Sequence, residues 1–138
     1  MQFPIRQLSQ KEFPSLLGQI PERDYPAALY IRGVLPGPGY TYLCVVGSRA
    51  TSVYGRRVTQ QLIAGLAQYP IAIVSGMALG IDGEAHKAAL DAGLPTVAVL
   101  PSSLDDASIY PATNKALAHR ILTRGGCLMS EHEKPHKA

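Results

Sequence analysis

Four short apolar runs alternate along the chain with segments of helical periodicity, and this pattern limits the fold more than any other feature. The runs lie at residues 40–47, 70–76, 95–101 and 126–131. Each is apolar throughout rather than alternating, which is typical of strands in a parallel sheet that is buried on both faces. The sequence therefore predicts an α/β, Rossmann-like domain. Its sheet is expected to be doubly wound and mostly parallel, with about four parallel strands and helices on both faces.

Three segments next to these runs carry apolar residues at helical spacing: 54–69, 82–93 and 112–125. Asp82 is the expected N-cap of the second helix, and Gly93 is the glycine expected just past its C-terminal end. The side chains expected to face inward are Val58, Leu62 and Leu66 in the first helix and Leu117, Ile121 and Leu122 in the third.

The expected domain organisation is one compact unit with extensions at both ends. With 138 residues, 46% of them hydrophobic, the chain can bury a single core without a metal or a disulfide. Residues 1–40 are expected to form a leader packed on the main domain, with a short helix near 13–20, a Pro/Gly-rich loop and an edge strand. Residues 41–131 would then be the Rossmann-like domain, and residues 132–138 a polar tail.

Composition points to an intracellular protein with no tie to a membrane. No segment approaches the roughly 18 continuous apolar residues of a membrane span, and the N-terminus lacks the order of a signal peptide. Cys44 and Cys127 lie inside apolar runs, so both are expected to be buried thiols in a reducing compartment. The expected location is therefore cytoplasmic. A net charge of +3 permits an anionic partner without demanding one.

The predicted topology places a binding site at the carboxyl ends of the strands. Loops rich in small and hydroxyl side chains follow the first three strands, at residues 47–55, 75–82 and 101–111, and such loops meet at one edge of a parallel sheet. There, glycines such as Gly76 and Gly80 would leave room for a phosphate at the start of the second helix. The site is expected to hold an anion, with Arg49 gripping phosphate oxygens.

The sequence lacks two common nucleotide-binding signatures and has only a weak metal-site pattern. The chain contains neither G-x-G-x-x-G after the first strand nor G-x-x-x-x-G-K-[ST] anywhere, which disfavours a nicotinamide cofactor or a P-loop nucleotidase. Asp82 and His86 share a helical face with Glu84 nearby, but two ligands without a third make a weak metal site. No metal, no cofactor and no catalytic residue is predicted, although a general base among these residues stays an alternative.

Several motifs in order resemble the DNA-processing protein A (DprA/Smf) family. They are VVGSRATSVYGRRV, IVSGMALGIDGEAHKAALDAG, TVAVLPSSLDDASIYPATNKALA and GGCLMSE, preceded by a leader similar to that family's from about residue 11. The resemblance implies an extended Rossmann-like domain that binds single-stranded DNA during natural transformation. It also implies a RecA-type recombinase as a partner, and neither a required cofactor nor an established catalytic step.

The family's motifs imply phosphate-contacting and neighbouring residues in this sequence. The family's Tyr, Pro and Asn motif after the third strand falls on Tyr110, Pro111 and Asn114, and its His on His86. Base stacking is a candidate role for Tyr54, and Arg56 adds charge beside the first loop. The full set expected to bind DNA or phosphate is Gly47, Ser48, Arg49, Tyr54, Arg56, Ser75, Gly76, Gly80 and Asp82.

A departure from the family leaves alternatives open. The family's domain continues beyond the SE of the fourth strand into segments that form its dimer surface, so this chain resembles a truncated member or a short stand-alone relative, and homodimerisation is a weaker expectation. A nucleotide-sensing module is one alternative. A phosphoribohydrolase-like enzyme acting on a nucleoside monophosphate is the other, although GGCLMSE lacks the proline and threonine of that signature.

Overall fold

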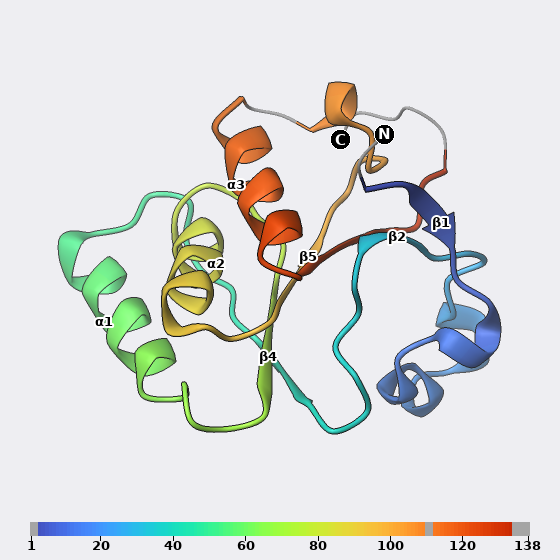
Figure 1. Ribbon diagram of the computed structural model, residues 1–138, viewed down its shortest axis with the longest axis horizontal. Helices are drawn as coiled ribbons and strands as arrows, with labels where there is room; N and C mark the ends of the chain where they lie inside the picture. The colour runs from blue at the N-terminus through green and yellow to red at the C-terminus, as the bar shows by residue number, and fades with distance from the viewer. Residues whose placement is uncertain (1–2, 110–111, 134–138) are drawn as a thin grey trace.

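The computed structural model describes residues 3–109 and 112–133. These residues form one six-stranded sheet in the order β1-β2-β6-β5-β4-β3 (Figure 1). The four strands β6, β5, β4 and β3 are parallel, whereas β2 and β1 continue the sheet in antiparallel pairing. The predicted mostly parallel α/β fold is confirmed, and residues 1–40 contribute two antiparallel strands where one edge strand was expected. The strands are β1 (Ile5–Gln7), β2 (Tyr30–Gly33), β3 (Thr41–Cys44), β4 (Ile71–Ser75), β5 (Thr96–Val99) and β6 (Cys127–Ser130).

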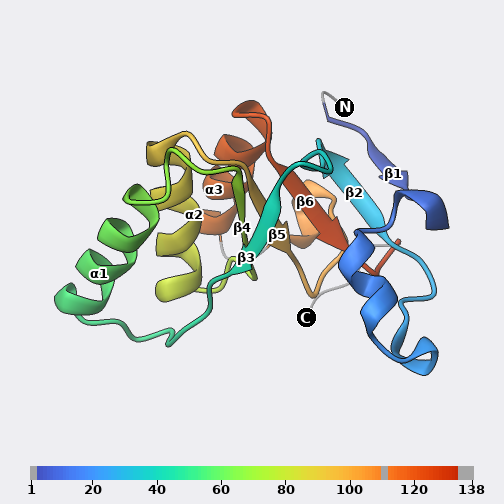
Figure 2. The same ribbon diagram turned by 90° about the horizontal axis from the view of Figure 1, so that it is seen from below.

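All three α-helices lie on one face of this sheet (Figure 2). They are α1 (Val53–Ala64), α2 (Ile81–Ala92) and α3 (Ala112–Thr123). Successive parallel strands step in one direction from β3 to β6, and right-handed crossovers made in one direction must all pass over the same face. Helices were also predicted on the second face of the sheet. That face is instead covered by short 3-10 turns of the leader, namely η1 (Gln10–Glu12), η2 (Ser15–Gln19) and η3 (Glu22–Asp24).

The core is divided by the sheet, because neighbouring strand residues point to opposite faces. Val97 packs with Ile31 and Cys127 beneath the leader. Ala98, the next residue, packs with Leu128 in the cluster under α2 and α3. One leader therefore supplies both an antiparallel extension of the sheet and the cover of its second face.

Two predicted helix features are confirmed and one is wrong. Gly93 follows α2 in a left-handed conformation, with φ 74°, as a C-terminal glycine should. Leu117, Ile121 and Leu122 of α3 are all buried. The N-cap of α2 is Gly80, however, and Asp82 lies inside the first turn of that helix.

The structure also corrects the expected burial of the first βα unit. Because β3 is the last strand of the sheet, it is largely exposed, and so is Cys44. In α1 the buried residues are Thr59 and Ile63, while Leu62 is 67% exposed. Cys127 is buried as expected, and burial raises the pKa of its thiol to about 12. The leader helix expected near 13–20 is the 3-10 turn η2.

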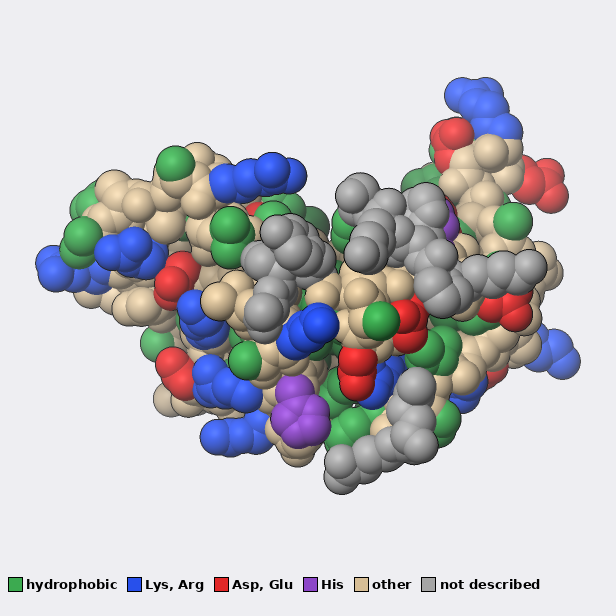
Figure 3. Space-filling model, turned by 90° about the horizontal axis from the view of Figure 1, so that it is seen from above, with side chains coloured by type: hydrophobic (Ala, Val, Ile, Leu, Met, Phe, Trp, Pro, Cys, Tyr) green, Lys and Arg blue, Asp and Glu red, His purple; other side chains and the backbone are tan. Residues whose placement is uncertain are grey.

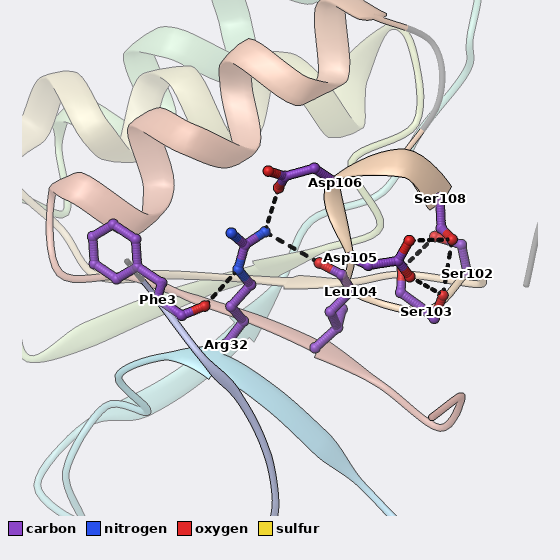
Figure 4. A network of polar contacts seen from close by, with 8 residues as sticks. All are labelled: Phe3, Arg32, Ser102, Ser103, Leu104, Asp105, Asp106 and Ser108. Atoms are coloured by element: carbon purple, nitrogen blue, oxygen red, sulfur yellow. Dashed lines mark hydrogen bonds and ion pairs between the residues drawn. The ribbon is translucent and has the colours of Figure 1, made fainter. Parts of the chain in front are cut away.

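A buried arginine fastens the leader to the loop after β5 (Figure 4). Nε of Arg32 donates to the carbonyl of Phe3 at 2.8 Å, and its Nη1 donates to the carbonyl of Leu104 at 3.2 Å. The same Nη1 forms an ion pair with Asp106 at 2.6 Å. The loop is further stiffened by hydrogen bonds that join Ser103, Asp105 and Ser108.

Candidate nucleic-acid interface

The loops after β3 and β4 are fastened to each other by Asp82. Its carboxylate accepts the backbone N–H of Gly47 and that of Gly76, both at 3.2 Å. The N–H of Ile81, at the start of α2, donates to the carbonyl of Ser48 at 3.1 Å. One side chain of the helix therefore positions both loops of the predicted site.

The glycines of these loops allow close packing, which differs from the predicted open turn. A Cβ on Gly80 would lie 2.5 Å from the carbonyl oxygen of Arg49 and still closer to that of Ser48. A Cβ on Gly47 would lie 2.7 Å from the side chain of Ile81. Because the Ile81 N–H is already bonded, the start of α2 is occupied by protein carbonyls rather than left open for a phosphate.

An accessible cavity lies beside this junction, where three helices begin. It has a volume of about 390 Å³. Arg49, Arg56 and Lys87 contribute three positive charges, and Glu84 is the carboxylate in its wall. Figure 3 views the molecule from above Figure 1, and Lys and Arg side chains gather there over the half of the surface that the α-helices form. The wall consists of Arg49, Ala50, Thr51, Arg56, Ala78, Leu79, Gly80, Gly83, Glu84, Lys87, Thr113, Asn114 and Leu117.

The electrostatics of this cavity favour an anion. Arg49 and Arg56 form no ion pair within residues 3–109 and 112–133. The negative charge of Glu84 is partly balanced by its neighbours. Its Oε2 accepts a hydrogen bond from Gln60 at 3.3 Å, and its Oε1 lies 4.0 Å from Nζ of Lys87. The N-terminal turns of α1, α2 and α3 add the positive ends of their dipoles.

Helix α1 begins beside the cavity with an ordinary cap. The Oγ of Ser52 accepts the N–H of Gly55 at 3.0 Å, and the first turn holds no acidic residue. Arg56 follows in that turn and reaches the cavity wall. The cap fixes where the helix starts and so fixes the position of Arg56 relative to the loop that carries Arg49.

The structure separates the predicted site residues into three groups. Arg49, Arg56 and Gly80 line the cavity, while Gly47, Gly76 and Asp82 form the junction behind it. The side chains of the remaining three residues point elsewhere. Ser75 is 2% exposed and donates to the Val45 carbonyl at 2.5 Å, Ser48 donates to the Ala50 carbonyl at 2.9 Å, and Tyr54 is 76% exposed outside the cavity wall.

Lys87 and Thr113 are wall residues that sequence reasoning missed. Each lies within the first two turns of a helix that starts at the carboxyl edge of the sheet, and that position was the available signal. Asn114, implied by the family motif, also lines the cavity, and its Nδ2 donates to the carbonyl of Met77 at 3.0 Å. Tyr110 and Pro111 of the same motif lie outside the described residues.

His86 is buried behind the site and does not face the cavity. Its Nδ1 lies 2.6 Å from Oγ1 of Thr96, whose hydroxyl donates to the Ile73 carbonyl at 3.1 Å. Burial lowers the pKa of His86 to about 4, although the Ser75 backbone and the Asp82 charge act in the opposite direction. No group of three or more metal-ligating side chains occurs in the described part of the chain.

This buried histidine predicts a loss of stability in mild acid. The unfolded chain takes up a proton near pH 6.5, whereas the folded chain resists protonation down to about pH 4. The contribution of His86 is therefore complete above pH 6.5 and declines as the pH falls, by about 3 kcal/mol in all. Urea unfolding between pH 4 and 7.5 should show this slope. It should be flatter in His86→Gln, and parallel curves for the two proteins would contradict the prediction.

Parallel strands joined by helices, with a basic cavity at the carboxyl edge of the sheet, define a Rossmann-like α/β domain. The sequence profile of the DNA recombination-mediator protein A family matches residues 5–138. The chain therefore belongs to this family. Within residues 3–109 and 112–133, no helix has the length and apolar character needed to cross a membrane.

Individual relatives agree with this assignment and are longer proteins. Protein Smf of Escherichia coli is 44% identical over 108 residues, which are 78% of this chain and 28% of that protein. DNA processing protein DprA of Streptococcus pneumoniae is 39% identical over 119 residues, 86% of this chain and 40% of that protein. The chain thus spans less than half the length of these two curated relatives.

Two solved structures share the fold over nearly the whole chain. DNA processing protein A from Helicobacter pylori, whose structure was described for its single-stranded DNA binding mode, superimposes with a TM-score of 0.79 at 30% identity. The match covers 99% of this chain and 60% of that one. DprA from Streptococcus pneumoniae gives a TM-score of 0.76 at 34% identity, over 99% of this chain and 47% of the other.

Proposed function

We propose that the basic cavity binds the phosphate backbone of single-stranded DNA, as part of a DprA-like recombination mediator that processes DNA in natural transformation. One observation carries the proposal: Arg49 and Arg56 line a cavity at the start of three helices without an ion pair in the described residues. Unpaired guanidinium groups at helix N-termini suit phosphate oxygens. The single-stranded DNA binding described for the Helicobacter pylori relative supports this ligand.

A free mononucleotide is the second candidate ligand. The volume of about 390 Å³ falls within the range of about 300–1,000 Å³ that is usual for small-ligand sites. A strand of DNA differs from a mononucleotide because it continues beyond the cavity, where the exposed ring of Tyr54 offers a stacking surface on α1. Competition between the two ligands therefore separates the candidates.

We propose that the site binds without catalysing a reaction. Glu84 is the carboxylate of the cavity wall, and its two oxygens face Gln60 and Lys87. His86 is fully buried and does not line the cavity, so it is not available there as a general base. Contact with a RecA-type recombinase, homodimerisation and a cytoplasmic location stay predictions based on the family.

Replacing Arg49 by alanine tests the proposed DNA site. Loss of one arginine–phosphate contact should weaken binding of a labelled poly-dT oligonucleotide by about tenfold or more, since hydrogen bonds to charged groups are worth about 1.5–3 kcal/mol. The slope of log affinity against log salt should fall by about 0.7. The melting temperature should stay nearly unchanged, because Arg49 is exposed.

Arg23→Ala is the matched control for this experiment. Arg23 is an exposed arginine of η3, in the leader on the opposite face of the sheet, so its loss should change neither affinity nor stability appreciably. Fluorescence anisotropy at low and moderate salt, with unlabelled nucleoside monophosphate as competitor, gives all the readings. Equal affinity of Arg49→Ala and the parent chain would reject the site. Complete displacement by the monophosphate would favour the mononucleotide.

A further inference from the structure

Glu84 places a negative charge in a cavity whose other charged residues are cations. Its side chain is only 16% exposed, and it shares the wall with Arg49, Arg56 and Lys87. A carboxylate that is shielded from water in this way is screened less by solvent and salt than an exposed one. Glu84 therefore repels an anion in the cavity, although the cavity as a whole attracts one.

Two helices hold this carboxylate in place. Gln60 of α1 donates to its Oε2 at 3.3 Å, and Nζ of Lys87, one turn further along α2, lies 4.0 Å from its Oε1. Part of the charge of Lys87 is therefore offset before any ligand binds. Among residues 3–109 and 112–133, Arg49 and Arg56 form no ion pair, so these two guanidinium groups supply most of the attraction.

The start of α2 does not compensate for this repulsion. The N–H of Ile81 donates to the carbonyl of Ser48 at 3.1 Å, and that of Gly83 donates to the carbonyl of Ala78 at 3.0 Å. Asp82, which lies between them and is 7% exposed, adds a second carboxylate to the same turn. Free N–H groups at the start of a helix are the usual donors to a terminal phosphate. Here these two donors are already bonded, so a ligand in the cavity must depend on side chains.

We propose that Glu84 sets the charge selectivity of the cavity. It lowers the affinity for a doubly charged terminal phosphate by more than it lowers the affinity for a singly charged phosphodiester. The cavity thereby selects the internal phosphates of a DNA strand against free nucleotides and phosphorylated strand ends, which compete for the same basic groups. The proposal rests on the proposed function, because the cavity must bind phosphate, and it names the form of phosphate that the cavity accepts.

The charge of the ligand decides the size of this effect. The electrostatic energy between Glu84 and a ligand is proportional to the charge of the ligand, so a phosphomonoester with two charges is repelled twice as strongly as a phosphodiester with one. Doubling an energy squares the corresponding factor in affinity. Removal of the Glu84 charge should therefore raise the affinity for the monoester by about the square of the gain for the diester.

Glu84→Gln tests this relation with two probes that differ by one charge. The first is thymidine 5′-monophosphate, which carries nearly two charges at pH 7.5 because its second ionisation lies at about pH 6. The second is the methyl ester of the same phosphate, which carries one charge. Chemical-shift titration of the ¹⁵N-labelled chain at low salt measures both dissociation constants. If the ester gains about threefold in affinity, the monophosphate should gain about tenfold.

Two further variants separate the charge of Glu84 from its packing. Glu84→Asp keeps the charge and should retain most of the parent chain's discrimination between the probes. Asp91→Asn removes a carboxylate from the same helix outside the cavity wall, where its side chain is 77% exposed and lies 3.6 Å from Arg120. This control should change both affinities by less than about twofold, since exposed charges are well screened. Glu84→Gln keeps an oxygen that can accept from Gln60, so its melting temperature should stay close to that of the parent chain.

The possible outcomes separate this proposal from the proposed function. Equal gains for the two probes in Glu84→Gln, or no gain for either, would overturn the role of Glu84 while leaving the phosphate site intact, provided that Arg49→Ala still weakens both probes. The same change in Asp91→Asn as in Glu84→Gln would also overturn it, because the effect would then come from net charge alone. No effect of Arg49→Ala on either probe would instead reject the cavity as a phosphate site, and both proposals with it.

Discussion

Gly80→Ala should destabilise the protein more than the same exchange at Gly93 or Gly37. The native φ of Gly80 is 86°, which strains a residue with a side chain. The new methyl group would also lie 2.5 Å from the Arg49 carbonyl and closer still to that of Ser48. We expect a loss of about 3 kcal/mol or more and a melting temperature lower by about 10 °C.

The two other glycines separate the causes of this effect. Gly93 has φ 74° with nothing within 4 Å of its added Cβ, so Gly93→Ala measures backbone strain alone, about 1 kcal/mol. Gly37 is open as well and has no positive φ, so Gly37→Ala should change stability by less than about 0.5 kcal/mol. Thermal and urea unfolding of the three variants should follow this order. Equal losses for Gly80→Ala and Gly93→Ala would show that the two loops are not in close contact.

The same exchange at Gly80 should weaken DNA binding if the proposed site is correct. The methyl group would push against the segment of Ser48 and Arg49, and a shifted loop carries its guanidinium away from the cavity. A folded fraction of Gly80→Ala that bound poly-dT as tightly as the parent chain would mean that the loop position does not matter for affinity. Binding should therefore be measured well below the melting temperature of the variant.

Arg32→Met should release the N-terminal segment from the domain. Methionine keeps much of the apolar stem but leaves the carbonyls of Phe3 and Leu104 without their donor. Buried polar groups left unpaired cost about 1–3 kcal/mol each, so the total loss should be about 2–4 kcal/mol. Asp106 is 78% exposed and is solvated when its partner is removed, so it adds little to the loss.

Arg6→Met is the matched control for this variant. Arg6 belongs to β1 and pairs with Glu12 at 2.9 Å, but both side chains are about half exposed, at 53% and 41%. Its loss should cost less than about 1 kcal/mol. Amide exchange in β1 should accelerate in Arg32→Met and change little in Arg6→Met. Full stability of Arg32→Met would show that the ion pair contributes no net stabilisation, as happens when burial cost cancels attraction.

Together these contacts support the edge of the sheet that carries the basic cavity. Asp82 and Gly80 hold the first two loops in contact, and Arg32 holds the leader against the third. The charged side chains of the cavity are thereby presented by a junction whose own polar groups are already paired. Stability and affinity should therefore be separable at Arg49 and inseparable at Gly80.

The sequence alone determined the four parallel strands, the three α-helices and the edge of the sheet at which their loops lie. Uniformly apolar runs of strand length can be satisfied only inside a covered sheet, and helical spacing between them demands crossovers. Local sequence was also enough to predict that Gly93 ends α2, since a helix end needs a residue that tolerates a positive φ. Arg49 could be predicted at the carboxyl edge of the sheet, because it lies in the loop that follows the first apolar run, and it does line the cavity there.

Only the tertiary structure decided which strands lie at the edges of the sheet and what each polar group contacts. Strand order made β3 an edge, which exposed Cys44 and left Leu62 without cover, although both residues read as buried in the sequence. Asp is a residue type typical of an N-cap, but the carboxylate of Asp82 accepts the backbone N–H of Gly47, 35 residues away, and that of Gly76. Such contacts depend on distances between segments that are remote in the chain, and local propensity carries no information about them.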